Sequence, residues 1–491
     1  MPRSSAERVR WCALALVALV PRLAGALLRR AWHDEYFTAW AVRLSLHDLV
    51  AALRLDSGPP LPYVLAKAVA ATGLEPVAAA RAISVAAGTG AVLLGARAAG
   101  RAFGPRAGWW TGALLAVHPL AVAWSCEGRA YALVMLAAAW AWDRVASLGE
   151  SGRGATGLAL AVSLACWSHG LGMLLAVVLA LAALTLAPPS RLRGLAAVGA
   201  GLASHLPWLP VALHQPAAAV AWMTAAWRAI PLAGRIAAPV RMLSPGAAFA
   251  TAVDVPSSPA WLEALAALAL VALVAAGSRA RGSPRFALGL ALPVVILGVL
   301  AFLGVPAFYP GRGEVLAIVP LAALAGVTAG SHRFGALAGA ALVAVGATTV
   351  GRAEVAWAAT PVRDEQQIAD TLRRAMPSGG VVLVGGYWRL GVAYHLGARA
   401  PFELVSVPEE AARHPGWFDA ATDRPGPGEL DRLRERLAGS QTPVALVIPR
   451  SLPGAGELSG LAAWLGGRPL LSIGDTTVVL CAHPASQRSG S

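Results

Sequence analysis

The chain has 491 residues, of which 57% are hydrophobic and 13% are charged, and its mean hydropathy is +0.61. A soluble globular protein carries about 25% charged residues, so this composition excludes an ordinary soluble protein and predicts a membrane protein with many spans. The net charge is +14, with Lys67 as the only lysine. Such cations sort to cytoplasmic loops and anionic headgroups in membrane proteins, and we find no nucleic-acid-binding module.

The first predicted span is the apolar run 11–28, which follows a basic N-terminus. It is too long for the apolar region of a signal peptide and has no clear cleavage site, so we expect it to stay uncleaved. Apolar runs of sufficient length predict about eleven spans in all: 11–28, 76–98, 108–124, 131–146, 156–168, 171–187, 195–213, 258–277, 286–305, 314–330 and 335–351.

Short arginine-bearing loops set the predicted topology, because such loops are typically cytoplasmic. Loops 1–10 and 97–106 are both basic, so an even number of spans separates them and 61–74 does not cross. We expect 61–74 and the amphipathic segment 44–55 to be juxtamembrane helices on the outer face. The N-terminus is then cytoplasmic and the C-terminus extracytoplasmic.

The last part of the chain has a different character, with frequent charges and short β-type runs. Strands are predicted at 381–384, 444–448 and 476–480, helices at 365–376 and 429–437, and a loop at 414–428. Strands that alternate with helices predict a small α/β domain. We therefore expect two domains, a membrane catalytic domain over 1–351 and an extracytoplasmic α/β domain over 352–491.

The four cysteines show no metal-binding spacing. Cys126 and Cys166 both fall near the predicted outer face, which allows a disulfide, but free thiols in apolar surroundings are the favoured interpretation.

The acidic pair Asp34-Glu35 follows the first span directly, after His33. Carboxylates at a membrane edge cost solvation energy and often mark function, and a carboxylate here is placed to take a proton from an acceptor that arrives from water. The alternative is a solvated loop start, in which Trp32 and Tyr36 belong to an interfacial aromatic belt.

Five polar clusters fall on the predicted outer face: 33–35, 56–67, 127–131, 167–170 and 308–314. Each has a simpler explanation, such as an ion pair between Glu127 and Arg129, a capped turn at His169, or an Arg312 that reaches lipid headgroups. Together they offer carboxylates, a histidine and cations at the depth of lipid phosphates. This inventory suits glycosyl transfer, in which a carboxylate activates a hydroxyl and cations compensate the departing phosphate.

In order along the chain, the segments HDEYFTAW, DSGPPLPYVL, EGRAYALVM, WSHGLGMLL and RGEVLAIVPLAALAG resemble the GT-C superfamily of integral membrane glycosyltransferases. The likeness is to bacterial relatives of the protein O-mannosyltransferases, the aminoarabinose transferases and the rhizobial galacturonosyltransferases. It covers about 1–351 and, more loosely, the extracytoplasmic tail, and it implies a place in the bacterial plasma membrane. It implies a GT-C fold and inverting transfer of a sugar from a polyprenyl-phosphate donor to a glycan, lipid or protein acceptor. It also implies action without a metal or other cofactor, although another GT-C branch uses a divalent ion, so metal dependence stays open.

The resemblance and the residue chemistry together assign roles. Asp34 is the expected general base and Glu35 orients the acceptor or the sugar. Arg129, Lys67 and Arg312 are expected to bind the donor phosphate, and the substrate cavity is expected to be lined by His33, Asp56, Tyr63, Glu127, Tyr131 and His169. One departure is that many relatives have Arg-Tyr where this chain has Arg312-Gly313, which weakens the match at that position.

Two other functions compete with this hypothesis. A transporter or flippase of lipid-linked sugars also places charges near headgroups, but it normally needs polar groups near the middle of the bilayer, where these spans are mostly Ala, Leu and Val. The second is a catalytically inactive scaffold that binds through its tail, against which the intact acidic pair argues.

Overall fold

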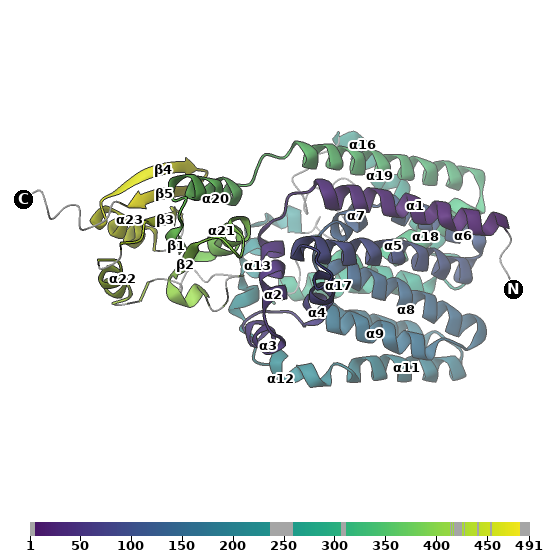
Figure 1. Cartoon of the computed structure of the whole chain (residues 1–491). Coiled ribbons are helices and arrows are strands. Elements are labelled where there is room, and N and C mark those ends of the chain that lie inside the picture. Colours follow the sequence, from purple (N-terminus) through teal and green to yellow (C-terminus); the bar gives the residue numbers. More distant parts are fainter. Residues whose placement is uncertain are drawn as a thin grey trace, which may run out of the picture. The chain divides into compact units, whose positions relative to one another are not determined.

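The computed structural model describes residues 5–235, 259–305, 311–412, 414, 416, 425–426, 428–438, 441–451 and 454–481 (Figure 1). It divides into two compact units. The first comprises Met1–Arg29 and Ser57–Thr360, and the second comprises Arg30–Asp56 and Pro361–Ser491. The domain boundary predicted after residue 351 falls within helix α19 (Arg333–Ala359).

The first unit is a bundle of apolar helices, which confirms the prediction of a helical integral membrane protein. Among the described residues, five helices are long and apolar enough to cross a membrane, and they begin at Ser5, Pro76, Pro188, Pro284 and Arg333. The main helices of this unit are α1 (Ser5–Leu28), α4 (Leu61–Ala70), α5 (Pro76–Phe103), α6 (Pro105–Val117), α7 (Pro119–Ser125), α8 (Tyr131–Ser151), α9 (Ala155–Ser168), α10 (Leu171–Leu184), α11 (Pro188–Ala203), α13 (Ala218–Ala229), α16 (Ala260–Gly277), α17 (Pro284–Phe302), α18 (Ile318–Ser331) and α19.

The segment 108–124, predicted as a single span, is instead broken into two helices. Helix α6 ends at Val117 and α7 begins at Pro119, because proline lacks the N–H that would continue the helix and disfavours a helical conformation at His118 before it. The wholly buried Arg22 of α1 caps the last carbonyls of α6, which are also buried. Its guanidinium donates to the carbonyls of Ala116 at 2.9 Å and Leu115 at 3.1 Å.

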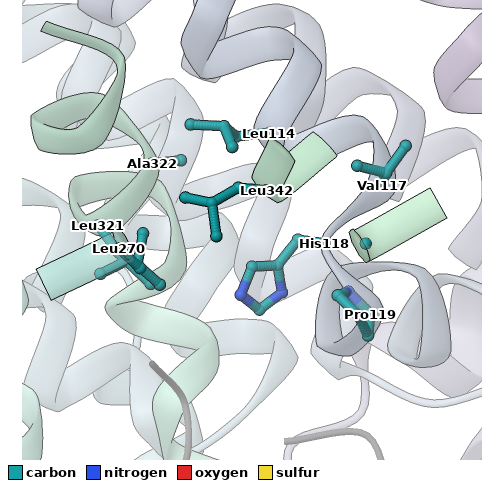
Figure 2. Close-up of a pocket in the computed structure, with 9 residues that line it drawn as sticks. Leu114, Val117, His118, Pro119, Leu270, Leu321, Ala322 and Leu342 are labelled. Carbon is teal, nitrogen blue, oxygen red and sulfur yellow. The ribbon is translucent and has the colours of Figure 1, made fainter. Parts of the chain in front are cut away.

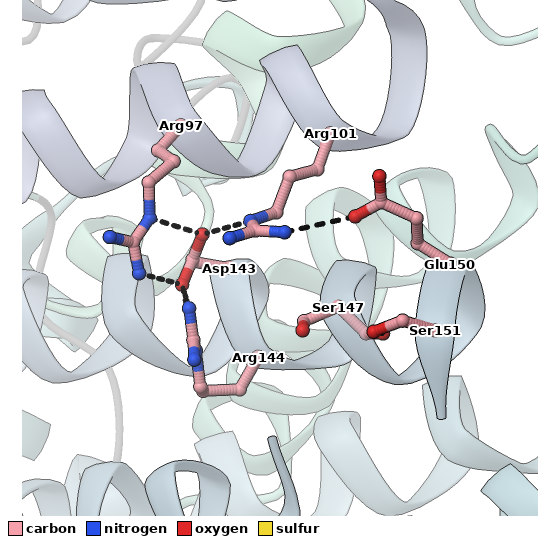
Figure 3. Close-up of polar contacts among 7 residues, drawn as sticks. All are labelled: Arg97, Arg101, Asp143, Arg144, Ser147, Glu150 and Ser151. Atoms are coloured by element: carbon pink, nitrogen blue, oxygen red, sulfur yellow. Dashed lines mark hydrogen bonds and ion pairs between the residues drawn. The ribbon is translucent and has the colours of Figure 1, made fainter. Parts of the chain in front are cut away.

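A buried carboxylate joins α5 to α8 (Figure 3). Asp143 of α8 is 0% exposed and accepts hydrogen bonds from Arg97 at 2.8 and 2.7 Å, from Arg101 at 3.1 Å, and from its neighbour Arg144. Arg101 also bonds Glu150 at 2.9 Å. Since a buried charge is tolerated only when it is well paired, Asp143 organises three guanidinium groups that would otherwise repel one another.

A pocket lies between α6, α16, α18 and α19, and Figure 2 shows the imidazole of His118 among its leucine side chains. His118 is 9% exposed, and neither ring nitrogen has a hydrogen-bond partner in the described part of the chain. None of the predicted site residues lines this pocket.

We expect His118→Leu to leave the thermal stability of the purified protein unchanged or to raise it. A buried polar group without a partner costs about 1–3 kcal/mol, and leucine fills the same space without that cost. Leu114→Ala in the same wall is the matched control and should destabilise by about 2–5 kcal/mol. A fall in Tm for His118→Leu as large as the fall for Leu114→Ala would show that the imidazole has a structural partner after all.

The second unit is a small α/β domain with the acidic N-terminal segment attached, and the predicted C-terminal α/β fold is confirmed. Its sheet has the order β2-β1-β3-β5-β4, with β2, β1 and β3 parallel and β5 antiparallel to β3 and β4. The strands are β1 (Gly380–Gly385), β2 (Phe402–Val407), β3 (Val444–Pro449), β4 (Gly467–Ile473) and β5 (Thr476–Cys481). Strands β2 and β4, at the two edges, were not predicted.

Alternating side chains of the strands form two apolar layers, as the period of two requires. Val382 and Val384 face the helices α20 (Asp364–Ala375) and α21 (Arg389–Leu396). Val381 and Leu383 face α22 (Glu429–Ala438) and α23 (Ala455–Trp464). Two further helices of this unit, α2 (His33–Arg43) and α3 (Leu46–Arg54), lie between α1 and α4 in the sequence.

The predicted juxtamembrane segments 44–55 and 61–74 contain the helices α3 (Leu46–Arg54) and α4 (Leu61–Ala70).

The cysteines Cys126 and Cys166 are both buried free thiols, which is the interpretation that the sequence favoured. The predicted loop 414–428 lies largely outside the described residues, as do residues 308–310 of the fifth polar cluster.

Candidate functional site

The predicted site residues fall into two groups, one in each unit. The membrane unit contains Lys67, Tyr63, Glu127, Arg129, Tyr131, His169 and Arg312, and the second unit contains His33, Asp34, Glu35 and Asp56.

In the membrane unit, the turn between α7 and α8 carries Glu127 and Arg129. The carboxylate of Glu127 is buried and accepts a hydrogen bond of 2.7 Å from Arg29, whose side chain is 9% exposed. Arg81 of α5 donates to the carbonyls of Ala26 at 2.7 Å and Arg29 at 2.8 Å and thereby holds the end of α1. Arg29 and Arg81 were missed in the sequence analysis, although Arg29 was visible as the first charge after the span.

Arg312 is positioned by the glycine before it. Gly311 has a φ of +86°, a region that L side chains rarely adopt. Its N–H donates to the buried carboxylate of Glu314 at 3.0 Å, and its carbonyl accepts from the indole of Trp124 at 2.7 Å. With the backbone held on both sides, the guanidinium of Arg312 lies 5.8 Å from the ring centroid of Tyr131, a cation–π distance.

His169 lies between α9 and α10, against Tyr131, with ring centroids 5.2 Å apart. Burial, Arg129 and Arg312 lower the pKa of His169 to about 3, so the ring is neutral near pH 7. Its Nδ1 accepts the N–H of Leu171 at 3.1 Å, which leaves the proton on Nε2. The structure therefore gathers Arg129, Tyr131, His169 and Arg312, and both guanidinium groups act on one imidazole.

Lys67 and Tyr63 lie one helical turn apart on α4, which packs against α5. Tyr63 is buried and Lys67 is half-buried. They share one face of the helix because residues four apart are neighbours on a helix surface.

In the second unit, both acids lie in the first turn of α2, which begins after Trp32. The partial positive charge of a helix N-terminus stabilises carboxylates at this place. Glu35 is 0% exposed, whereas Asp34 is half-buried. Of the two, Asp34 is thus the carboxylate that a reactant from water can approach.

His33 and Asp56 both act electrostatically on a third residue, His414, which was not predicted from the sequence. Burial lowers the pKa of His414, Asp56 raises it and His33 lowers it, so all three groups interact. His33 Nε2 also lies 2.9 Å from the carbonyl oxygen of Gly416. The signal for His414 was absent from the sequence because it lies more than 350 residues beyond α2, in the predicted loop.

No group of three or more His, Cys, Asp or Glu side chains is gathered as a metal site in the part of the chain that the structure describes. The second unit presents the carboxylate of Asp34 at a helix N-terminus. The membrane unit presents the cations Arg129 and Arg312 beside the neutral imidazole of His169 and the ring of Tyr131. A carboxylate can accept a proton, and a pair of guanidinium groups can bind an anion.

Solved structures that resemble this chain include an ArnT and an oligosaccharyltransferase. One is ArnT from Cupriavidus metallidurans in the apo state, with 16% identity, 97% of this chain and 98% of that chain covered, and a TM-score of 0.48. The same protein bound to undecaprenyl phosphate gives a TM-score of 0.45 at 16% identity, with the same coverage. The apo oligosaccharyltransferase of Archaeoglobus fulgidus has 12% identity, covers 95% of this chain and 74% of that chain, and has a TM-score of 0.49.

No protein-family profile and no curated protein sequence matches this chain. The assignment of chemistry therefore rests on its own residues.

Proposed function

We propose that this protein is an inverting glycosyltransferase that moves a sugar from a polyprenyl-phosphate donor to an acceptor hydroxyl at the extracytoplasmic membrane face. The observation that carries the proposal is the convergence of Arg129 and Arg312 on His169 beside Tyr131. Burial is the main cause of the lowered pKa of His169, and the two guanidinium groups add to it, so two positive charges act at one place. Such a site suits the phosphate that leaves when the glycosidic bond breaks, because arginine binds phosphate through paired hydrogen bonds.

In this reaction Asp34 takes the proton from the acceptor hydroxyl while its oxygen attacks the anomeric carbon. The bond from that carbon to the phosphate oxygen breaks, and the electron pair stays on the polyprenyl phosphate. Arg129 and Arg312 compensate the charge that develops there, with Lys67 as a further cation. The neutral His169 can donate its Nε2–H, and Glu35 orients the acceptor or the sugar.

The half-buried carboxylate of Asp34 at the start of α2 supports its role as the base, since it is both accessible and stabilised as an anion. The acceptor is a glycan, a lipid or a protein, and donor cleavage outside the cell requires that the lipid-linked sugar be delivered to that face. We place the N-terminus in the cytoplasm and residues 352–491 outside, on the charge distribution of the loops.

The test measures release of polyprenyl phosphate from a panel of radiolabelled polyprenyl-phosphate sugars by the full-length protein in lipid. Release from one donor supports the proposal and names the sugar. Movement of the same lipid-linked sugars across liposomes without release would overturn it in favour of a flippase.

Arg312→Gln should reduce kcat/KM for the donor by about 100-fold, the loss expected when one charge-stabilising donor is removed. Arg129→Gln should have an effect of the same size. Arg153→Gln is the matched control, because Arg153 is exposed beyond the end of α8. Equal activity in all three variants would remove the phosphate role from Arg129 and Arg312.

A further inference from the structure

The acidic helix α2 belongs to the same compact unit as the C-terminal domain. It is the segment 30–56 that joins residues 361–491, although more than 300 residues separate them in the sequence. The contacts that hold this helix therefore bear on the carboxylate of Asp34.

The main contact is a hydrogen bond between Tyr36 and His395 of α21. The Tyr36 hydroxyl donates to the carbonyl of Ala31 at 3.0 Å, and it lies 3.0 Å from His395 Nε2. Since the hydroxyl proton is used on Ala31, the imidazole must donate, and its proton is on Nε2. Tyr36 is 1% exposed and also packs on Tyr394, with ring centroids 4.9 Å apart.

His395 is itself held from the far side. Arg373 of α20 donates to the backbone carbonyls of His395 and, at 3.2 Å, of Leu396, and its other nitrogen bonds Asp370 at 2.7 Å. Burial and Arg373 lower the pKa of His395, while Asp370 raises it, and burial dominates. The imidazole is therefore a neutral donor near pH 7, fixed by two helices of the α/β domain.

The rest of α2 is held by a second set of contacts. His33 Nε2 lies 2.9 Å from the carbonyl oxygen of Gly416, and the ring centroid of Phe37 lies 5.0 Å from that of His414. A Cβ on Gly416 would come within 2.5 Å of Phe37, so the backbone approaches the ring closely there. Residues on both sides of Asp34 and Glu35 are thus anchored to the C-terminal domain.

We infer that His395 is a positioning residue for the acidic pair, and that the C-terminal domain fixes the orientation of the catalytic base through it. The inference rests on the proposed function of Asp34. Tyr36 follows the pair at once, so a shift of its ring turns the first helical turn and with it the carboxylate. A displacement of about 1 Å in a reacting group lowers the rate about 100-fold.

The experiment compares His395→Phe and His395→Gln in the full-length protein, in lipid, with the polyprenyl-phosphate sugar that the wild type turns over. Phenylalanine keeps the ring and removes the donor, whereas the amide of glutamine places an N–H near the position of Nε2. His47→Phe is the matched control, because His47 lies on α3 in the same unit with a side chain that is 93% exposed.

For His395→Phe we expect kcat to fall by about 10- to 100-fold with the donor KM within about twofold of wild type, since the phosphate-binding arginines are unchanged. His395→Gln should recover most of kcat, and His47→Phe should match the wild type. Hydrogen exchange measured by mass spectrometry should show faster exchange in residues 33–43 of His395→Phe, with the other helices unaffected.

The inference fails if His395→Phe keeps the wild-type kcat, or if His395→Gln is as slow as His395→Phe. It also fails if the slow variant shows unchanged exchange in α2, because the loss then has another cause. A wild type that releases no lipid phosphate from any donor overturns the proposed function and this inference together, whereas an active wild type with an equally active His395→Phe overturns only the inference.

Discussion

Asp34→Asn is expected to abolish sugar transfer while the protein stays folded. Asparagine has the same shape and keeps the start of α2, but it cannot accept the proton of the acceptor hydroxyl. Loss of a general base costs about 10²- to 10⁴-fold in rate, so transfer should fall to near the background. The measurement is single-turnover release of polyprenyl phosphate with donor bound in excess acceptor.

The controls separate chemistry from structure. Asp48→Asn changes an exposed acid on α3, which belongs to the same unit, and should transfer at the wild-type rate. Asp34→Asn should keep the wild-type Tm and the wild-type affinity for the donor, because the proposed phosphate ligands are elsewhere in the sequence. Full transfer by a folded Asp34→Asn would refute its role as base.

Asp143→Asn is expected to destabilise the membrane unit by about 3–5 kcal/mol, the usual cost of removing one partner from a buried ion pair. Three guanidinium groups would then face one another around a neutral amide, at the junction of α5 and α8 (Figure 3). We expect a lower Tm in detergent and a lower yield of the purified protein.

Glu150→Gln is the matched control for this prediction, because Glu150 bonds Arg101 with a side chain that is 53% exposed. An exposed ion pair contributes about 0–1 kcal/mol, so its Tm should hardly change. A double variant, Asp143→Asn with Arg97→Gln, should regain part of the loss, since one of the mutually repelling charges is gone. Additive losses in the double variant would contradict this account.

Much of the fold could be predicted from local pattern. The apolar runs indicated the membrane helices, and the inner strands β1, β3 and β5 were found because their residues are apolar and β-branched. The edge strands β2 and β4 were missed because edge strands bury less and carry polar residues, and β4 contains Pro469. The helix break at His118 was not predicted, although Pro119 is a signal for it, because the surrounding residues are continuously apolar.

The candidate site could be predicted only in part, for a related reason. Local motifs marked Glu127, Arg129 and Tyr131, which lie within five residues of one another. The partners that complete the geometry come from distant segments, and no local pattern announces them. Arg29 lies 98 residues before Glu127, and His395 lies 359 residues after Tyr36. Such pairs are set by tertiary packing, which a single sequence does not reveal.

The arginine that caps the end of α6 has a consequence for how the chain enters the membrane. The carbonyl of Leu115 that accepts from Arg22 lies 93 residues further along the chain, and proteins are inserted from the N-terminus during synthesis. An arginine within a span costs up to about 2.5–3.5 kcal/mol on insertion. When α1 is made, Arg22 can bond the carbonyl of Ala18 in its own helix at 2.7 Å, but the carbonyls of Leu115 and Ala116 have not yet been synthesised. We therefore expect the guanidinium of Arg22 to stay nearer to water until α6 is made, and to reach its final position only then. Biogenesis of this protein is thus expected to depend on a late rearrangement of its first span.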